Sequence, residues 1–215
     1  MNEENKMNKV ELFDIDKMPE YATINREFEE TKVKYNAHKY GAYMFDYPFI
    51  VNHIDIPNDR IIDFGCGLGA LDFYLADKGC EVWAIDRDDT RWFMEKHPKI
   101  HFVHGAIPEG MRIEDGEWDY VIAASSIEHN PPEKIKQIFT YGMSLLRAGG
   151  IFIATMVALK EAQMMGSTFC LDVPAIKEIF DIDASEEFTK FNDLFAKFGT
   201  KFTYPFLSIG IVVYK

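Results

Sequence analysis

Residues 60–70 read Arg-Ile-Ile-Asp-Phe-Gly-Cys-Gly-Leu-Gly-Ala, and this stretch decides the fold. Its apolar start is typical of a buried parallel strand. Gly65, Gly67 and Gly69 follow at once, and glycines let a backbone turn tightly and approach a ligand closely. A helix predicted over 71–78 comes next, and its free N–H groups favour a polar or anionic group. The stretch therefore predicts a strand, a ligand-binding turn and a helix.

The same alternation of strand and helix continues downstream. After the first strand, further strands are expected over 81–85, 100–103, 120–124 and 151–156, with predicted helices over 90–96 and 131–146. Short connections between such elements indicate a parallel sheet covered by helices on both faces. Residues 208–214 are expected to add an antiparallel strand at the sheet edge. We predict an α/β, doubly wound fold.

The N-terminal and C-terminal segments differ from this pattern. Residues 1–18 are interpreted as a loose polar arm, followed by a helix after Pro19. We expect two parts: an N-terminal arm with helices over 1–56, a candidate cap over the site, and a cofactor-binding domain over 57–215 with a lid at about 157–185. An aromatic stretch either closes over the site or covers the sheet edge; its residues are Tyr40, Tyr43, Phe45 and Tyr47.

The composition limits the classes of partner. The chain has 215 residues, a net charge of −12 and no apolar run long enough for a membrane helix. Such an acidic chain repels phosphate backbones, which argues against nucleic acid as a partner. Cys66, Cys80 and Cys170 are odd in number and widely spaced, so neither a disulfide framework nor a metal site is indicated. A cytoplasmic location is the expectation.

Two cofactor classes fit the glycine stretch. Gly65, Gly67 and Ala70 match the dinucleotide fingerprint, and Asp86 ends the second strand, where a carboxylate accepts hydrogen bonds from ribose hydroxyls in both classes. The second class is a ligand that carries an ammonium and a sulfonium and no phosphate. Asp63 favours this class over a dinucleotide, because a carboxylate beside the glycines repels a pyrophosphate and suits a cationic ligand. The alternative interpretation is that Asp63 caps the helix or a loop N–H.

At this point the sequence resembles the class I S-adenosylmethionine-dependent methyltransferases. The resemblance runs in order from about residue 60 to 156 through five motifs: 63–69, 82–86, 118–122, 125–129 and 145–153. It implies a Rossmann-like methyltransferase fold, with a mostly parallel seven-stranded sheet and an antiparallel C-terminal strand. It also implies S-adenosylmethionine as cofactor and S-adenosylhomocysteine as product.

The resemblance assigns the cofactor-binding residues. They are Asp63, Gly65, Cys66, Gly67, Gly69, Asp86, Arg87, Gly105, Ala106, Ile107, Ser125 and Ser126. One departure is that Ala106 stands where many relatives carry an acid that holds the adenine amino group. The adenine is then expected to be held by backbone groups and by packing against Arg87 or Ile107.

His129 and Glu128 are the candidate catalytic residues. His129 follows the fourth strand on the ligand side of the sheet, and imidazole is a suitable base near neutral pH. The alternative is that both residues organise the loop or contact the methionine part of the cofactor. Glu128 either orients His129 or binds substrate. Cys66 is interpreted as a small buried residue, not a nucleophile.

The resulting hypothesis is methyl transfer from S-adenosylmethionine to oxygen, nitrogen or carbon of a small-molecule acceptor. A sugar or nucleotide-sugar is the suggested acceptor, and a monomer or homodimer without membrane contact is the expected state. The alternatives are an NAD-dependent oxidoreductase, a non-catalytic S-adenosylmethionine-binding partner subunit and a methyltransferase acting on a macromolecule.

Overall fold

The computed structural model describes residues 8–12, 18–37, 43–55, 57, 59–109, 113, 117–159, 161–190 and 207–215. Seven strands form one sheet in the order β1-β9-β6-β5-β2-β3-β4. In chain order they are β1 (Lys9–Leu12), β2 (Arg60–Phe64), β3 (Glu81–Asp86), β4 (Ile100–His104), β5 (Trp118–Ala124), β6 (Leu146–Ala158) and β9 (Leu207–Tyr214). Strands β2 to β6 run parallel to one another, whereas β9 is antiparallel to β6. The predicted mostly parallel sheet is confirmed, but the expected edge position of the C-terminal strand is wrong, because β1 pairs with the free side of β9.

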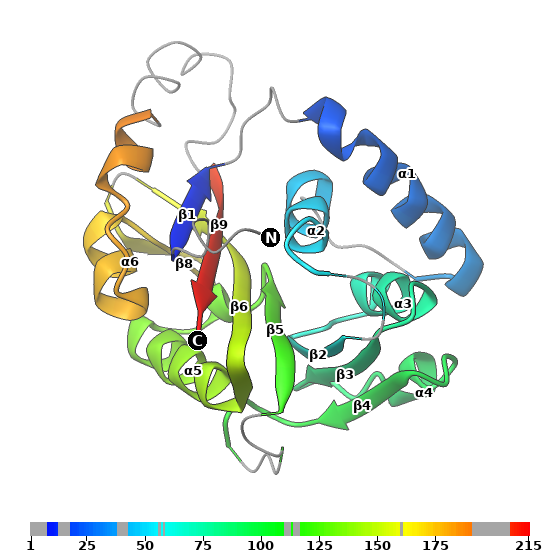
Figure 1. The fold of residues 1–215 in the computed structure, drawn as a ribbon. Helices are drawn as coiled ribbons and strands as arrows, with labels where there is room; N and C mark the ends of the chain where they lie inside the picture. Colours follow the sequence, from blue (N-terminus) through cyan, green and yellow to red (C-terminus); the bar gives the residue numbers. More distant parts are fainter. Residues whose placement is uncertain are drawn as a thin grey trace.

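Helices cover both faces of this sheet (Figure 1). One face carries α1 (Met18–Tyr35), α2 (Tyr43–Val51), α3 (Ala70–Asp77) and α4 (Arg91–Met94); the other carries α5 (Pro132–Leu145) and α6 (Val173–Phe180). Each face has its own cluster of buried apolar side chains, which includes Phe49 and Phe73 on the first face and Phe152 and Phe180 on the second. Within the described residues, every helix is too short or too polar to cross a membrane.

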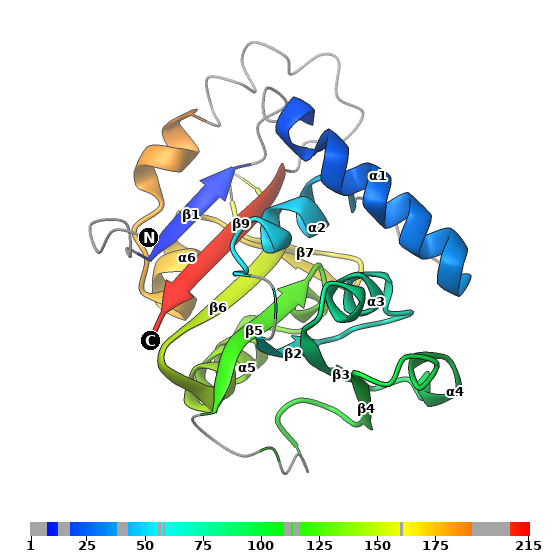
Figure 2. The same ribbon diagram turned by 45° about the vertical axis from the view of Figure 1, so that its right-hand side comes forward.

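The N-terminal segment contributes a strand, which corrects the interpretation of residues 1–18 as a loose arm. β1 pairs with β9 in antiparallel register, Val10 opposite Ile211, at the edge of the sheet (Figure 2). The sequence signal was weak because the strand has only four residues and two of them, Lys9 and Glu11, are charged. A short edge strand with charged residues has the same composition as a polar loop, so the sequence alone does not distinguish the two.

Helix α2 lies against β9, β6 and β5 of the sheet. It keeps Pro48 inside the helix. Its Phe49 ring packs directly on the backbone of Gly210 in β9, where any Cβ would overlap the ring. This close approach fixes how α2 lies on the sheet, and with it the direction of the polar side chains of α2.

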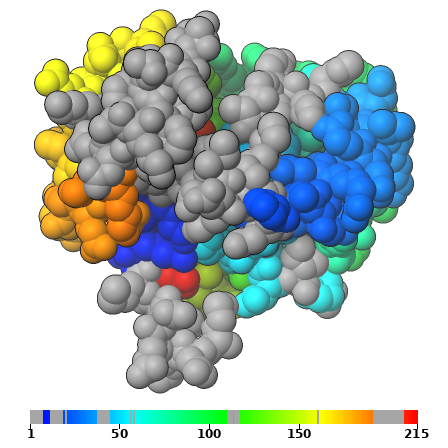
Figure 3. Space-filling view, turned by 90° about the horizontal axis from the view of Figure 1, so that it is seen from above, coloured from blue at the N-terminus to red at the C-terminus, as the bar shows by residue number. Residues whose placement is uncertain are grey.

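The predicted lid region has regular structure. After β6 the chain forms the hairpin of β7 (Gln163–Met165) and β8 (Thr168–Cys170), and a bridge joins Ala158 to Leu171. Leu171 is fully buried in the core under α6. Seen from above, α1 (blue) and the hairpin (yellow) lie on opposite sides of the molecule (Figure 3). The closing of residues 157–185 as a lid stays a prediction.

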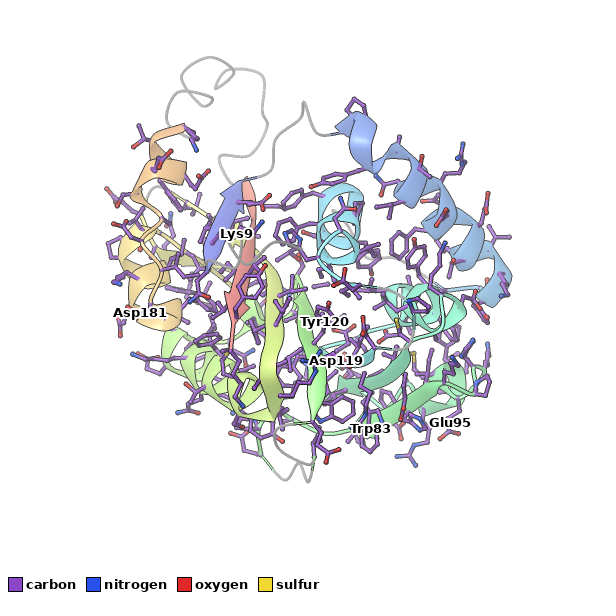
Figure 4. All side chains as sticks on the ribbon, in the orientation of Figure 1. Lys9, Trp83, Glu95, Asp119, Tyr120 and Asp181 are labelled. Carbon is purple, nitrogen blue, oxygen red and sulfur yellow. The ribbon has the colours of Figure 1, made fainter. Side chains whose placement is uncertain are left out.

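The starts of the central strands are joined by polar side chains of β5 (Figure 4). Asp119 accepts hydrogen bonds from the Arg60 N–H at 2.7 Å and from the Arg147 Nε at 2.6 Å. The Tyr120 hydroxyl accepts a hydrogen bond from the Asp55 N–H at 3.0 Å. These bonds fix the amino-terminal side of the sheet, which leaves the opposite side for a ligand.

Candidate active site

A cavity of about 650 Å³ opens at the carboxyl ends of the parallel strands. Ligands of open parallel sheets bind at this place. Two sets of residues line it. The first set, called the glycine-loop half, consists of Asp63, Gly65, Cys66, Gly67, Gly69, Asp86, Arg87, Gly105, Ala106 and Ile107. The second set is called the α2–η3 half, after α2 and the 3-10 helix η3 (Ile127–His129), and consists of Asp46, Tyr47, Ser125, Ser126, Glu128, His129, Val157 and Thr168. All the sequence-predicted site residues therefore line one cavity.

The glycine loop has a conformation that requires glycine. Gly65, Gly67 and Gly69 have φ values of 82°, 55° and 66°, in the left-handed region. A Cβ on Gly65 would lie 2.5 Å from the Cβ of Ser126, so the loop also passes very close to the turn after β5. Gly69 is the N-cap of α3, which turns the free N–H groups of the first helical turn toward the cavity. The sequence predicted this part in full.

Asp86 holds the glycine loop from the end of β3. Its Oδ2 accepts a hydrogen bond from the Gly67 N–H at 2.8 Å, and its Oδ1 accepts one from the Asp88 N–H at 2.9 Å. A carboxylate has about four lone-pair sites, so two further hydrogen bonds remain available to ligand hydroxyls. Asp86 is therefore both a loop-forming residue and a candidate ribose-binding group.

Asp63 lies beneath the glycine loop beside a second acid, Asp72 of α3. Both are buried, at 2% and 0% exposure, and Asp63 Oδ1 has no hydrogen-bond partner in the described part of the chain. Burial, and then the neighbouring Asp72, raises the pKa of Asp63 well above its ordinary value, and burial raises the pKa of Asp72 to about 7. Capping a loop N–H does not account for the free oxygen, whereas a cationic ligand group would.

The third part of the glycine-loop half lies after β3 and β4. Arg87, Gly105, Ala106 and Ile107 line the cavity there. His104 Nε2 lies 2.9 Å from the Arg87 carbonyl oxygen, so His104 joins the two turns from outside the cavity. Cys66 also lines the cavity, and burial raises the pKa of its thiol, which fits its interpretation as an inert residue.

In the α2–η3 half, the turn after β5 carries a strained backbone. Ser125 has a φ of 45°, which is uncommon for a residue other than glycine and marks functional turns. The Ser125 N–H donates to Thr155 of β6, and the Ser126 hydroxyl donates to the Phe64 carbonyl at 2.5 Å. These bonds hold the turn so that the 3-10 helix η3 (Ile127–His129) lies beside the cavity.

The two predicted catalytic residues have different surroundings. His129 Nδ1 lies 3.2 Å from the Thr168 hydroxyl of β8, so the hairpin orients the ring. Glu128 is 1% exposed, and its Oε2 has no hydrogen-bond partner among the described residues. No hydrogen bond joins Glu128 to His129 in that part of the chain. Of the two functions predicted for Glu128, orienting His129 is therefore unsupported, and binding a ligand remains.

Asp46 is a site residue that the sequence reasoning missed. It is 1% exposed, and its Oδ2 accepts a hydrogen bond from the Ser125 hydroxyl at 3.1 Å. Burial raises the pKa of Asp46 to about 6 and that of Glu128 to about 8. Asp46 is the only acid in the otherwise apolar segment 43–51, a signal by which it could have been found.

The aromatic stretch divides between core and site. Phe45 is buried with its ring 5.3 Å from that of Phe49, whereas Tyr47 lines the cavity. Tyr40 and the side chain of Tyr43 lie outside the described residues. In the hairpin, Met164 and Met165 are exposed and Thr168 is the residue that lines the cavity. Thr168, like Asp72, gave no sequence signal.

Comparisons with known proteins agree with this geometry. Residues 61–150 match the family model described as a methyltransferase domain. An uncharacterized methyltransferase of Staphylococcus carnosus is 32% identical over 142 residues, 63% of this chain and 62% of that protein. A ubiquinone biosynthesis O-methyltransferase of Xanthomonas campestris pv. campestris is 26% identical over 145 residues, 63% of this chain and 58% of that protein. The chain thus spans about three fifths of the length of these curated relatives.

A solved structure shares the fold over nearly the whole chain. The 1,6-didemethyltoxoflavin-N1-methyltransferase of Burkholderia thailandensis, with bound 1,6-didemethyltoxoflavin and S-adenosylhomocysteine, superposes with a TM-score of 0.62. The superposition covers 97% of this chain and 96% of that one at 14% sequence identity. At this identity the likeness establishes the fold alone.

Proposed function

The chain belongs to the class I S-adenosylmethionine-dependent methyltransferases, and from this premise we propose that it transfers a methyl group from S-adenosylmethionine to a small-molecule acceptor. The observation that carries the proposal is Asp63, a buried carboxyl at the glycine loop with an oxygen that lacks a partner in the described residues. A pyrophosphate at this loop would meet a second acid, Asp72, behind the first. The alternative of an NAD-dependent oxidoreductase is correspondingly disfavoured.

The residues of the glycine-loop half fit the cofactor in charge and shape. Asp63 would accept the cofactor's ammonium, and Asp86 would accept its ribose hydroxyls with the lone pairs that Gly67 and Asp88 leave free. The loop has no Cβ at Gly65, where the turn after β5 approaches closely. Gly105, Ala106 and Ile107 would cover the adenine through backbone groups and packing, since Ala106 provides no acid.

When bound, S-adenosylmethionine supplies a methyl group on a sulfonium, which is a good leaving group. The chain's task is to hold the acceptor atom in line with that methyl group. The lone pair of the acceptor forms the new bond to carbon, and the electron pair of the broken carbon–sulfur bond remains on sulfur. An acceptor that carries a proton gives it to a base, for which His129, held by Thr168, is in position.

The atom that receives the methyl group is oxygen, nitrogen or carbon in this proposal. A sugar or nucleotide-sugar acceptor stays a prediction from the sequence, as do a monomeric or homodimeric state and the absence of a nucleic-acid partner. A cytoplasmic location is proposed from the three free cysteines.

Calorimetric titration with S-adenosylmethionine, S-adenosylhomocysteine and NAD tests the proposal. We expect the two sulfur ligands to bind and NAD not to bind. Asp86→Ala should weaken the sulfur ligands by about 100-fold, because it removes charged hydrogen bonds to the ligand and loosens the loop. Asp181→Ala, at an exposed acid after α6, is the matched control. Preferential binding of NAD, or no binding of either sulfur ligand, would overturn the proposal.

Binding without turnover has a separate meaning. If the cofactor binds to the wild-type protein and no methyl group reaches any small molecule, tRNA or protein, the chain is a non-catalytic partner subunit. Transfer to bulk tRNA or protein alone would instead identify a macromolecule methyltransferase.

A further inference from the structure

Two buried carboxyl groups meet the cavity in the α2–η3 half. Asp46 comes from α2 and Glu128 from η3, and both line the cavity while being 1% exposed. Asp46 Oδ1 and Glu128 Oε2 are each without a hydrogen-bond partner in the described part of the chain. The glycine loop and Asp86 belong to the other half of the cavity, after β2 and β3, so they do not explain why these two carboxyl oxygens lack partners.

No cation of the described residues compensates this pair. The causes that shift the pKa of Asp46 and of Glu128 include burial, hydrogen bonds and, for Glu128, the like charge of Asp46, but no lysine or arginine. Lys134, which lines the same cavity, is bound to Glu109. A buried carboxyl without a hydrogen-bond partner is unfavourable unless a ligand supplies the missing donors. The site is therefore built for a ligand group that donates hydrogen bonds and carries positive charge.

We propose that the methyl acceptor is a cationic amine, and that Asp46 and Glu128 bind its protonated nitrogen at the α2–η3 half of the cavity. This proposal rests on the methyl-transfer function proposed above. An ammonium has several N–H donors and no acceptor, so it can satisfy both free oxygens at once. Acceptors that carry a phosphate or diphosphate, including a nucleotide-sugar, would be repelled by the negative charge of this pair.

The charge of the pair matches a single ammonium. Burial raises the pKa of both carboxyls, of Asp46 to about 6 and of Glu128 to about 8, so the pair carries less than two full negative charges near neutral pH and a single ammonium can balance it. For transfer to the nitrogen, the ammonium gives one proton to a carboxylate or to His129, and the freed lone pair takes the methyl group. The product is an N-methylammonium and a neutral thioether, and the proton then leaves to water, so charge and atoms balance.

The test measures methyl transfer and binding in the same protein. Tritium-labelled methyl transfer is followed with sets of amines, alcohols, carboxylates and phosphates that share carbon skeletons. Binding of n-butylammonium and of n-butanol to protein saturated with S-adenosylhomocysteine is followed by ligand-observed NMR. We expect transfer to amines and binding of butylammonium, both weakened about 50-fold by Asp46→Asn, with cofactor affinity changed less than about threefold.

The controls separate this proposal from the underlying function. Asp181→Asn makes the same chemical change at an exposed acid after α6 and should alter neither readout; Asp181 is labelled in Figure 4. Glu128→Gln provides a second variant if Asp46→Asn fails to fold. Transfer only to alcohols, carboxylates or phosphates, or no amine transfer and no butylammonium binding while the cofactor still binds, overturns the acceptor assignment alone. Loss of cofactor affinity in Asp46→Asn equal to the loss of amine binding would show that the pair binds the cofactor's own ammonium.

Discussion

The glycine-loop half of the cavity comes from the turns that directly follow three parallel strands, β2, β3 and β4, whereas the α2–η3 half is assembled from segments of different kinds far apart in the chain. Gly65, Gly67 and Asp63 lie within a few residues of one another. In the second half, Asp46 and Ser125 are 79 residues apart, and His129 and Thr168 are 39 residues apart. Both halves contain buried acids, but only in the first half does the local backbone conformation of the glycine turn determine the shape of the ligand site.

This difference shows where specificity resides. A local turn with required φ values is kept in any chain that binds the same ligand, because few sequences satisfy it. An arrangement of side chains from separate helices and strands can change its chemistry by single substitutions. We therefore assign the cofactor to the glycine-loop half and the choice of acceptor to the α2–η3 half.

The largest effect is expected from Gly65→Ala, which would break the contact between the glycine loop and the turn after β5. The new Cβ would lie 2.5 Å from the Ser126 Cβ in a residue with a φ of 82°. We expect cofactor affinity to fall by at least about 100-fold, because loop and turn must separate. Gly166→Ala is the matched control, since Gly166 has a φ of 62° and nothing within 4 Å of the added atom.

Calorimetry with S-adenosylhomocysteine and thermal unfolding of both variants provide the measurement. Both alanines pay about 1–2 kcal/mol for the left-handed backbone, so only the first should lose ligand affinity. Equal loss in the two variants would show that backbone strain, not the close approach of the turn, explains the effect.

An intermediate effect is expected for the pH dependence of stability, and it concerns the acids of the second half. Glu128 has an ordinary pKa of 4.5 and a folded-state pKa of about 8, so between these values the folded chain holds a proton that the unfolded chain has lost. The free energy of unfolding should therefore fall as the pH rises from about 4.5 to 8. Glu128→Gln should remove this fall and be more stable than the wild type at pH 9 by roughly 1–4 kcal/mol.

Chemical denaturation at pH 5 and pH 9 measures this difference. The control is Glu95→Gln, at an acid that directly follows α4 and has a side chain 62% exposed. Its free energy of unfolding should differ little from that of the wild type at either pH. A wild-type protein equally stable at both pH values, with no gain in Glu128→Gln, would mean that water already satisfies the Glu128 carboxyl.

The smallest effect is expected from Thr168→Val, which separates orientation of His129 from binding. Loss of one hydrogen bond to the ring should lower kcat for the acceptor by about three- to tenfold, with cofactor affinity unchanged. Thr140→Val, at a threonine that bonds within α5, is the control. A change in cofactor affinity without a change in kcat would place His129 among the cofactor contacts instead.

Local sequence predicted the glycine-loop half well. The glycines, Asp63, Asp86 and the residues after β4 all line the cavity as expected, because each directly follows a strand of a parallel sheet. The sequence missed β1, which is a four-residue edge strand with two charged residues, Lys9 and Glu11. It also missed Asp72, because an acid in a helix is expected on the exposed face and Asp72 is buried next to another acid.

By itself, the sequence determined the alternation of strands and helices from β2 to β6, the glycine turn and the acid at the end of β3, because these depend on contacts between neighbouring residues. Tertiary structure alone decided that Asp46 joins Ser125 and Glu128 at the cavity. That meeting depends on how closely Phe49 of α2 packs on Gly210 of β9 and on the bonds that hold the turn after β5. Such packing joins segments with no shared pattern in the sequence, so only the folded chain reveals the carboxyl pair from which we infer the acceptor.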